Sequence, residues 1–314
     1  MNIIKKDNYY INKKTKKKIR SKKMIKQIKS MKIPPNYKNV KINTNKNAKV
    51  LAIGEDSKGR KQYIYNSNFT ELQKKKKFND LLILGKHIHK INKEIKKNIE
   101  SDLSIYDKNK IISVVIYIIN NCNFRVGNEE YKKKYNTYGT TTLNKKHLLF
   151  KKNEIEIRFN GKKNVENVCS IKNKNVIKIL KELYKNRNNN LFVYFSNDKY
   201  IPITSIQINS FLKKYDDRLT IKMLRTWNAN KLLLKSLVSL DKPKSKTETK
   251  KNIVKSNKVV AFKLHNTPIV CKKNYIHNNL CNLYLNNNKL FFEYEKKYNK
   301  NYNTFLYKLL KLNI

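Results

Sequence analysis

The pattern of apolar and polar positions divides the chain into two regimes. Between residues 38 and 65, apolar residues alternate with polar ones, which predicts short, half-buried strands. From residue 78 to 99 they recur every three or four positions, which predicts an amphipathic helix. Four consecutive lysines, residues 74–77, separate the two patterns. We therefore expect a β-rich N-terminal domain over residues 1–76 and a second domain over residues 77–314.

The second domain is predicted to be mainly helical, with one small sheet. Three apolar runs, at residues 147–150, 154–159 and 165–171, predict three strands, and Asn160-Gly161 is typical of a tight turn after the second. The fold class is therefore α+β. Further apolar runs predict helices at residues 111–119, 173–186, 204–214, 218–238, 250–264, 268–282 and 301–312.

Residues 1–36 show little apolar periodicity, carry runs of lysine and end in Pro34-Pro35. Such a segment is typical of a basic arm or a loosely ordered lead-in. The four cysteines are scattered without a CxxC pair, so we expect reduced thiols and no zinc site. No apolar window reaches ~18 residues, and we expect neither a signal peptide nor a membrane span.

The net charge of the chain indicates the kind of partner that it binds. The chain carries 72 Lys and Arg against 22 Asp and Glu, a formal net charge of +50. An AT-rich coding sequence would also enrich Lys, Asn and Ile, but solubility alone does not require this imbalance. We expect a polyanionic partner, a nucleic acid, bound with strong dependence on salt. Because Lys is the default cation here, each retained Arg is a candidate for a task that needs a planar guanidinium.

Several kinds of DNA chemistry have no support in the sequence. There is no GxxxxGK[ST] loop for a nucleotide, no HExxH, and no set of paired acidic residues for magnesium. A basic protein that acts on DNA without nucleotide or metal is left mainly with attack by a protein hydroxyl on the phosphodiester.

Five segments match that chemistry, in a fixed order along the chain. They are DSKGRKQY (residues 56–63), FRVGNEEY (124–131), FNGKK (159–163), IKMLRTW (221–227) and NTPIVCKKNYI (266–276). Together they resemble the type IB DNA topoisomerases, and among these the compact poxviral, mimiviral and bacterial members. Each segment alone is weak, whereas five in order are specific. The resemblance implies relaxation of supercoiled DNA through a transient 3′-phosphotyrosyl bond, without ATP, metal or other cofactor.

The resemblance also implies roles for single residues. Tyr275 is expected to be the nucleophile, with Arg125 and Arg225 holding the non-bridging phosphate oxygens as negative charge builds on them. Lys162 is expected to protonate the leaving 5′ oxygen, and Lys163 is the alternative in this lysine-rich turn.

One position departs from the poxviral pattern. Poxviral members carry a catalytic His nine residues before the tyrosine, where this chain has Asn266; bacterial relatives resemble this chain in having Asn there. An Asn amide can donate a hydrogen bond to a phosphate oxygen as the His would. We expect Asn266 to do so, with the neighbouring His265 as the alternative.

DNA contacts outside the reaction centre are also implied. Asn128 and Glu130 stand where poxviral members have lysines, so the preferred DNA site is expected to be altered or relaxed. The contact positions that the resemblance implies are Lys58, Arg60, Gln62, Tyr63, Tyr65, Tyr131 and Lys222.

Two other functions compete with this interpretation. Tyrosine recombinases share the two arginines, the lysine and the tyrosine, but normally carry a His where this chain has Lys222, and lack the DSKGRKQY segment. A non-enzymatic DNA-packaging protein would need only the charge. The resemblance favours a monomer that closes as a C-shaped clamp round its partner, double-stranded DNA. We expect no membrane partner. The lysine-rich composition favours a poxvirus-like DNA virus, and hence the virion or host cytoplasm.

Overall fold

The computed structural model describes residues 1–6, 9–186 and 188–312. The chain forms two compact units, Met1–Phe78 and Asn79–Ile314. The division lies inside α2 (Ser67–Glu100), a helix of 34 residues. The four lysines at residues 74–77 are therefore part of a helix and not an irregular linker.

The N-terminal unit is an antiparallel sheet with a short helix. The strand order is β2-β1-β3-β4-β5, and α1 (Lys22–Ser30) lies between β2 and β3 in the chain. The strands are β1 (Ile3–Lys6), β2 (Tyr9–Asn12), β3 (Lys38–Ile42), β4 (Val50–Glu55) and β5 (Lys61–Tyr65). The small core consists of Ile3, Ile28, Val40, Ile42 and Ala52.

The expectation of a loosely ordered arm over residues 1–36 is wrong. Ile3 pairs with Ile42 across the sheet, and Ile28 is buried from α1. In α1, Met24, Ile25 and Ile28 do lie at helical spacing, but the surrounding lysines favoured the interpretation of the segment as an arm. The burial of Ile3 depends on Ile42, 39 residues away, which a local pattern does not reveal.

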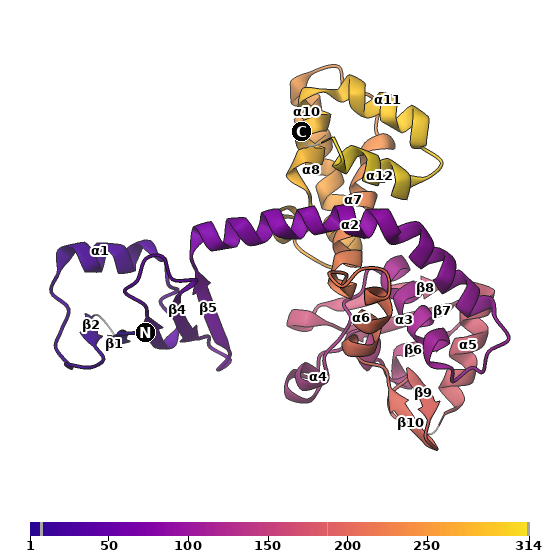
Figure 1. Ribbon diagram of the computed structural model, residues 1–314, viewed down its shortest axis with the longest axis horizontal. Helices are drawn as coiled ribbons and strands as arrows, with labels where there is room; N and C mark the ends of the chain where they lie inside the picture. The colour runs from indigo at the N-terminus through magenta and orange to yellow at the C-terminus, as the bar shows by residue number, and fades with distance from the viewer. Residues whose placement is uncertain (7–8, 187, 313–314) are drawn as a thin grey trace. The chain divides into compact units, whose positions relative to one another are not determined.

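The larger unit is built round two buried helices, α3 (Lys108–Cys122) and α7 (Ile221–Val238). Asp107 caps α3, and the helix buries its surface on every side because seven of its nine residues from Ile111 to Ile119 are apolar and buried. The helices α10 (Asn278–Asn286), α11 (Asn288–Tyr298) and α12 (Tyr302–Leu310) pack with α7 and with α8 (Lys246–Lys263) (Figure 1). The other helices are α4 (Glu129–Tyr135), α5 (Lys174–Lys185), α6 (Ser205–Lys213) and α9 (Pro268–Asn274).

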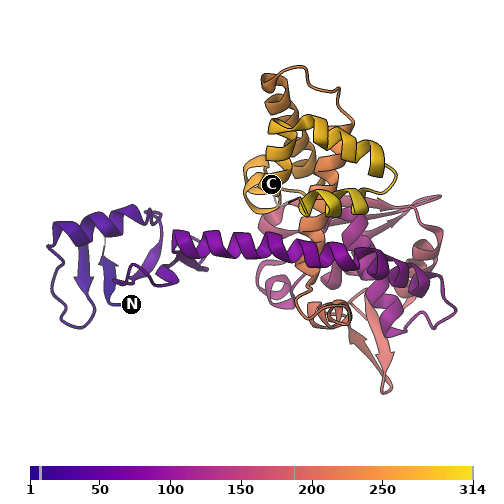
Figure 2. The ribbon, with the colours of Figure 1, turned by 45° about the horizontal axis from the view of Figure 1, so that its top comes forward.

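A three-stranded antiparallel sheet lies beside α3 (Figure 2). It consists of β6 (Leu148–Phe150), β7 (Ile155–Asn160) and β8 (Glu166–Ile171), which confirms the predicted α+β class with one small sheet in a mainly helical domain. A second hairpin, β9 (Val193–Ser196) and β10 (Lys199–Pro202), was not predicted. Asn197 and Asp198 form its two-residue turn, both in the left-handed region.

Two further expectations are wrong. The helix predicted over residues 268–282 is broken into α9 and α10, and the break begins at Tyr275. The cysteines are not all reduced thiols: Cys122 and Cys169 form a disulfide, whereas Cys271 and Cys281 are free. The sequence could not show this pairing because the two residues meet only when the end of α3 packs against β8. Among the described residues, no helix is long and apolar enough to cross a membrane.

Candidate active site

Arg225 lies on the buried face of α7, four residues after the start of the helix. Its side chain is buried, and Nη2 donates a hydrogen bond to the carbonyl of Leu264, at the end of α8. Burial and the neighbouring Arg125 lower the pKa of Arg225 to about 10, while Tyr275 raises it by charge attraction and a side-chain hydrogen bond. The guanidinium is thus cationic at neutral pH in a site largely closed to water.

The site holds hydrogen-bond donors that the protein itself does not satisfy. Nε and Nη1 of Arg225 and Nδ2 of Asn266 are buried, and none has a hydrogen-bond partner. Buried donors without acceptors are costly and are normally avoided in a folded core. Three such donors in one region make a site whose hydrogen-bonding capacity suits an anion.

Asn266 is hydrogen-bonded to Arg125, and it follows by two positions the residue whose carbonyl accepts from Arg225. Its Oδ1 accepts a hydrogen bond from Nη2 of Arg125 at 2.9 Å, which leaves Nδ2 as the amide's unsatisfied donor. The neighbouring His265 packs its ring against Phe124 at 5.9 Å between centroids and has φ of 50°. Burial, followed by the charges of Arg225 and Arg125, lowers the pKa of His265.

A threonine-rich turn holds the backbone of Arg125. The amide of Thr140 donates to the carbonyl of Arg125 at 2.8 Å, and the amide of Thr141 donates to Val126 at 2.7 Å. Gly139 must be glycine, since a Cβ there would lie 2.5 Å from the backbone of Gly127. The 3₁₀ turn η1 (Thr140–Thr142) is buried, and the sequence analysis did not single it out.

Tyr275 lies at the break between α9 and α10. Thr267 caps α9 and Pro268 occupies its first turn, where proline is well tolerated. Tyr275 ends that helix as its C-cap, and the guanidinium carbon of Arg225 lies 5.3 Å from the centre of the tyrosine ring. The predicted nucleophile is therefore brought beside one of the two predicted arginines, from a different helix.

Asn230, also missed by the sequence analysis, fixes that break. It is fully buried on α7, five residues beyond Arg225. Its amide nitrogen donates to the Tyr275 carbonyl at 2.8 Å, and its amide oxygen accepts from the His277 amide at 2.8 Å. One side chain thus anchors the tyrosine segment to the helix that carries Arg225.

Lys162 and Lys163 lie in the turn between β7 and β8, and both are exposed. The connection is longer than a two-residue turn: Gly161 is extended, and Lys163 and Asn164 adopt positive φ. Lys162 has no hydrogen bond or ion pair with any other residue that the structure describes. The structure therefore groups Arg125, Arg225, Asn266 and Tyr275 but does not bring Lys162 into contact with them.

The predicted DNA-contact residues of the N-terminal unit lie on β5 and the turn before it. Tyr63 and Tyr65 are exposed and stack at 6.1 Å between ring centroids. Arg60 and Gln62 both donate to the carboxylate of Asp56, and the Arg60 hydrogen bond lowers the pKa of that carboxyl to about 2. Lys58 is exposed.

Two predicted contact residues belong to the larger unit. Tyr131 is 56% exposed on α4 and stacks on Tyr135. Lys222 is exposed in the first turn of α7, three residues before the buried Arg225. Neither side chain is part of the cluster at Tyr275.

Comparison with known proteins agrees with this chemistry. Residues 66–302 match the family model of the eukaryotic DNA topoisomerase I catalytic core, and residues 8–56 match that of the bacterial DNA topoisomerase IB N-terminal domain. The chain belongs to the type IB DNA topoisomerases. The resemblance that the five segments suggested is thereby confirmed, and the enzyme's partner is DNA.

Viral members of the family are among its relatives. DNA topoisomerase 1B of Acanthamoeba polyphaga mimivirus is 33% identical over 79% of this chain and 76% of its own length. DNA topoisomerase 1B of Vaccinia virus is 28% identical over 73% of this chain and 70% of its own. The XerH site-specific recombinase bound to palindromic difH substrate, in its post-cleavage complex, matches with a TM-score of 0.39 and 19% identity. That match covers 61% of this chain and about half, 48%, of the recombinase.

Proposed function

We propose that this topoisomerase cleaves one DNA strand with Tyr275, whose phenolic oxygen displaces the 5′ oxygen of the broken strand. The tyrosine becomes joined to the 3′ phosphate, and the reverse reaction reseals the strand after supercoils have relaxed. The phosphotyrosyl ester conserves the energy of the phosphodiester, so religation requires no ATP. Cleavage and religation both use groups of the protein, and we propose no metal ion or other cofactor for the cycle.

The observation that carries this proposal is the set of unsatisfied donors beside the tyrosine. Arg225 contributes two buried N–H groups and Asn266 contributes one, and Arg225 also lies against the ring of Tyr275. A phosphate that entered this site would satisfy them. The additional negative charge of the five-coordinate transition state would strengthen the same hydrogen bonds, which is how fixed donors lower a barrier.

The remaining roles follow from the positions of the side chains. Arg125, held through its backbone and by Asn266, supplies the second guanidinium. Lys162, exposed on its turn, donates the proton to the leaving oxygen once DNA is bound. In the N-terminal unit, Tyr63 and Tyr65 contact the duplex together with Lys58, Arg60 and Gln62 of the same strand and turn. In the larger unit, the exposed Tyr131 and Lys222 do so. We propose a monomer that engages DNA with both units, in the virion or host cytoplasm of a DNA virus.

Plasmid relaxation in EDTA without ATP tests this proposal. Wild-type enzyme is expected to relax supercoiled plasmid, and Tyr275→Phe to bind DNA with unchanged affinity but to lose relaxation. Tyr298→Phe, a tyrosine at the end of α11, is the matched control and retains wild-type activity. Relaxation by Tyr275→Phe would exclude this nucleophile. Binding without relaxation by the wild-type enzyme would instead favour a packaging protein.

The assignment of Asn266 over His265 has its own test. Asn266→Ala removes both the unsatisfied donor and the partner of Arg125, so we expect cleavage to slow by about 10²-fold, as for loss of one oxyanion donor. His265→Ala removes a ring that packs on Phe124, and we expect less than about a tenfold change. The measurement is the single-turnover cleavage rate. Near-normal cleavage by Asn266→Ala together with loss in His265→Ala would reverse the assignment.

A further inference from the structure

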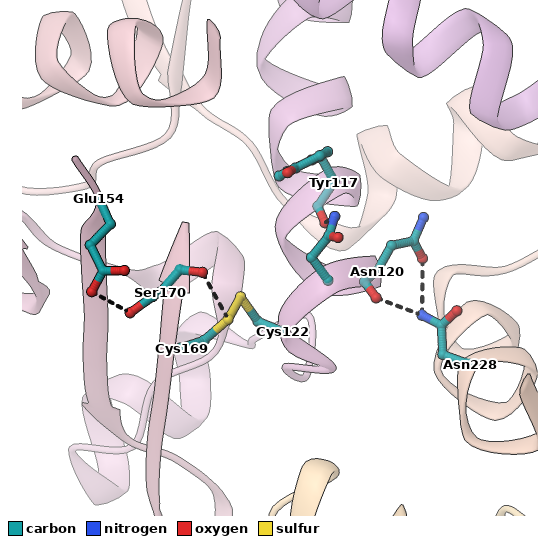
Figure 3. The surroundings of a disulfide bond; sticks show 8 residues. Tyr117, Asn120, Cys122, Glu154, Cys169, Ser170 and Asn228 are labelled. Carbon is teal, nitrogen blue, oxygen red and sulfur yellow. Dashed lines mark hydrogen bonds between the residues drawn. A yellow bond between two sulfur atoms is a disulfide. The ribbon is translucent and has the colours of Figure 1, made fainter. Parts of the chain in front are cut away.

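The disulfide joins the end of α3 to β8 (Figure 3), and each of these elements adjoins a segment with a proposed catalytic residue. Cys122 is the last residue of α3, and Arg125 follows it by three positions. Cys169 lies in β8, the strand that leads out of the turn bearing Lys162. The two residues are 47 positions apart in sequence and 5.6 Å apart between Cα atoms.

Few other contacts hold the β7–β8 hairpin near its turn. Cys169 is paired with Ile157, so the crosslink enters the hairpin on the buried face that also carries Phe159. Phe159 packs edge-on against Phe124, with ring centroids 4.8 Å apart, and the carbonyl of Asn160 accepts a hydrogen bond from the Tyr138 amide. Beyond these contacts the turn is exposed from residue 162 to 166.

The disulfide can therefore affect the position of the turn that carries Lys162, although the turn does not need the disulfide in order to form. The strand pairing from Ile155↔Ile171 to Asn160↔Glu166 and the Phe124–Phe159 contact hold the hairpin by bonds and packing of their own, so we expect both to remain when the disulfide is opened. Unlike these contacts, the disulfide is covalent, so it does not allow β8 to shift relative to the end of α3. A proton donor must lie within hydrogen-bond reach of the leaving oxygen, and small displacements from that position slow the reaction strongly.

We propose that the Cys122–Cys169 disulfide positions the Lys162 turn for protonation of the leaving 5′ oxygen, so that cleavage depends on the redox state of the enzyme. This inference rests on the proposed role of Lys162. A dithiol reductant opens the bond in two steps: its thiolate attacks one cysteine sulfur and displaces the other cysteine, and its second thiol then displaces the first cysteine from the mixed disulfide. The enzyme gains two thiols, and the reductant becomes a cyclic disulfide. Cys169 is half-buried and Cys122 is buried, so Cys169 is the accessible sulfur.

The test separates protonation from the rest of the reaction by changing the leaving group. Two duplexes carry the same cleavage site, first mapped in plasmid DNA, with either the normal 5′ oxygen or a 5′ sulfur at the scissile phosphate. A thiol with a pKa of about 8.5 leaves as a thiolate without needing a proton donor. Single-turnover cleavage of both duplexes is measured for the oxidised enzyme and for the enzyme reduced by a dithiol, with free thiols counted in each sample.

We expect reduction to slow cleavage of the oxygen duplex about tenfold, a part of the 10²- to 10⁴-fold that a general acid supplies. Cleavage of the sulfur duplex is expected to change by less than about twofold. The double variant Cys122→Ser, Cys169→Ser is expected to cleave both duplexes as the reduced enzyme does, whether or not the dithiol is present. Cys281→Ser, which removes a free cysteine of α10, is the matched control and keeps the redox response.

Lys162→Ala in the oxidised enzyme tests the role of Lys162 separately from the role of the disulfide. It should slow the oxygen duplex and spare the sulfur duplex. If it slows both equally, Lys162 is not the proton donor and the inference falls with that assignment. If Lys162→Ala discriminates between the duplexes but reduction slows both equally, slows neither, or accelerates cleavage, then the positioning role of the disulfide is overturned while the proposed function stands.

Discussion

At the scale of single residues, Asn230 shows how a side chain that touches no substrate can govern the reaction. Its two hydrogen bonds hold the backbone on either side of Ile276, and so fix where Tyr275 points relative to Arg225. Breaking them leaves the Tyr275 carbonyl and the His277 amide without this partner, at a cost of about 1–3 kcal/mol for each buried group.

We predict that Asn230→Ala slows single-turnover cleavage by at least about tenfold while DNA affinity stays within about twofold. A merely structural role would lower stability without this separation of rate from binding. Asn252→Ala is the control, because the Asn252 amide also donates two hydrogen bonds, an exposed one to Asp241 and a partly buried one to Tyr284, but none to the tyrosine segment. Equal effects of the two variants on cleavage would contradict the positioning role of Asn230.

His147 predicts how stability depends on pH. Burial is the main cause that lowers its pKa to about 4, and its Nδ1 accepts the amide hydrogen of Asn144. A histidine whose pKa is depressed in the folded state contributes stability above its unfolded pKa of about 6.5, and that contribution is lost as pH falls towards 4. At pH 5 the loss is about 2 kcal/mol.

Urea unfolding at pH 7 and pH 5 measures this loss. His147→Asn, which retains an acceptor but does not titrate, is expected to reduce the difference between the two pH values by about 2 kcal/mol. An unchanged pH dependence in the variant would show that His147 is not buried in its neutral form.

At the scale of elements, the sequence predicted the helices and strands whose apolar periodicity is strong, including α3, α7 and the β6–β7–β8 sheet. It failed where burial depends on distant partners. The strands β1 and β2 were missed because Ile3 needs Ile42 to form a core. The break at Tyr275 was missed because Asn230, on another helix, and the buried Ile276 fix it. In a chain rich in Asn, Asn230 has no local signal that separates it from solvent-exposed asparagines, and nothing in the local sequence marks the Thr140–Thr142 turn as buried.

Gly139 tests how closely the Arg125 segment must be held. A Cβ at this position would lie 2.5 Å from Gly127 and 2.8 Å from the carbonyl of Arg125, so both backbones must move apart. We predict that Gly139→Ala slows cleavage by more than about tenfold. Gly59→Ala, where a Cβ would meet no atom within 4 Å, incurs backbone strain alone and should leave cleavage near normal. Cleavage by Gly139→Ala at the rate of Gly59→Ala would contradict the tight packing behind Arg125.

At the scale of the whole molecule, a net charge of +50 explains attraction to DNA but not the reaction. Charge alone gives sequence-independent binding that weakens with salt, as it would for any packaging protein. What distinguishes an enzyme is the cluster of buried donors beside Tyr275. The members of this cluster could be proposed from the sequence because they lie in motifs. The Cys122–Cys169 disulfide could not be, because its two cysteines come together only in the folded chain.

The most direct test of the central claim is to locate the covalent bond. Enzyme that has been denatured during reaction with labelled duplex, digested and examined by mass spectrometry should carry the label on the peptide containing Tyr275, through the 3′ phosphate of the cut strand. A label on another tyrosine, attachment through a 5′ phosphate, or cleavage with no covalent adduct would contradict the account.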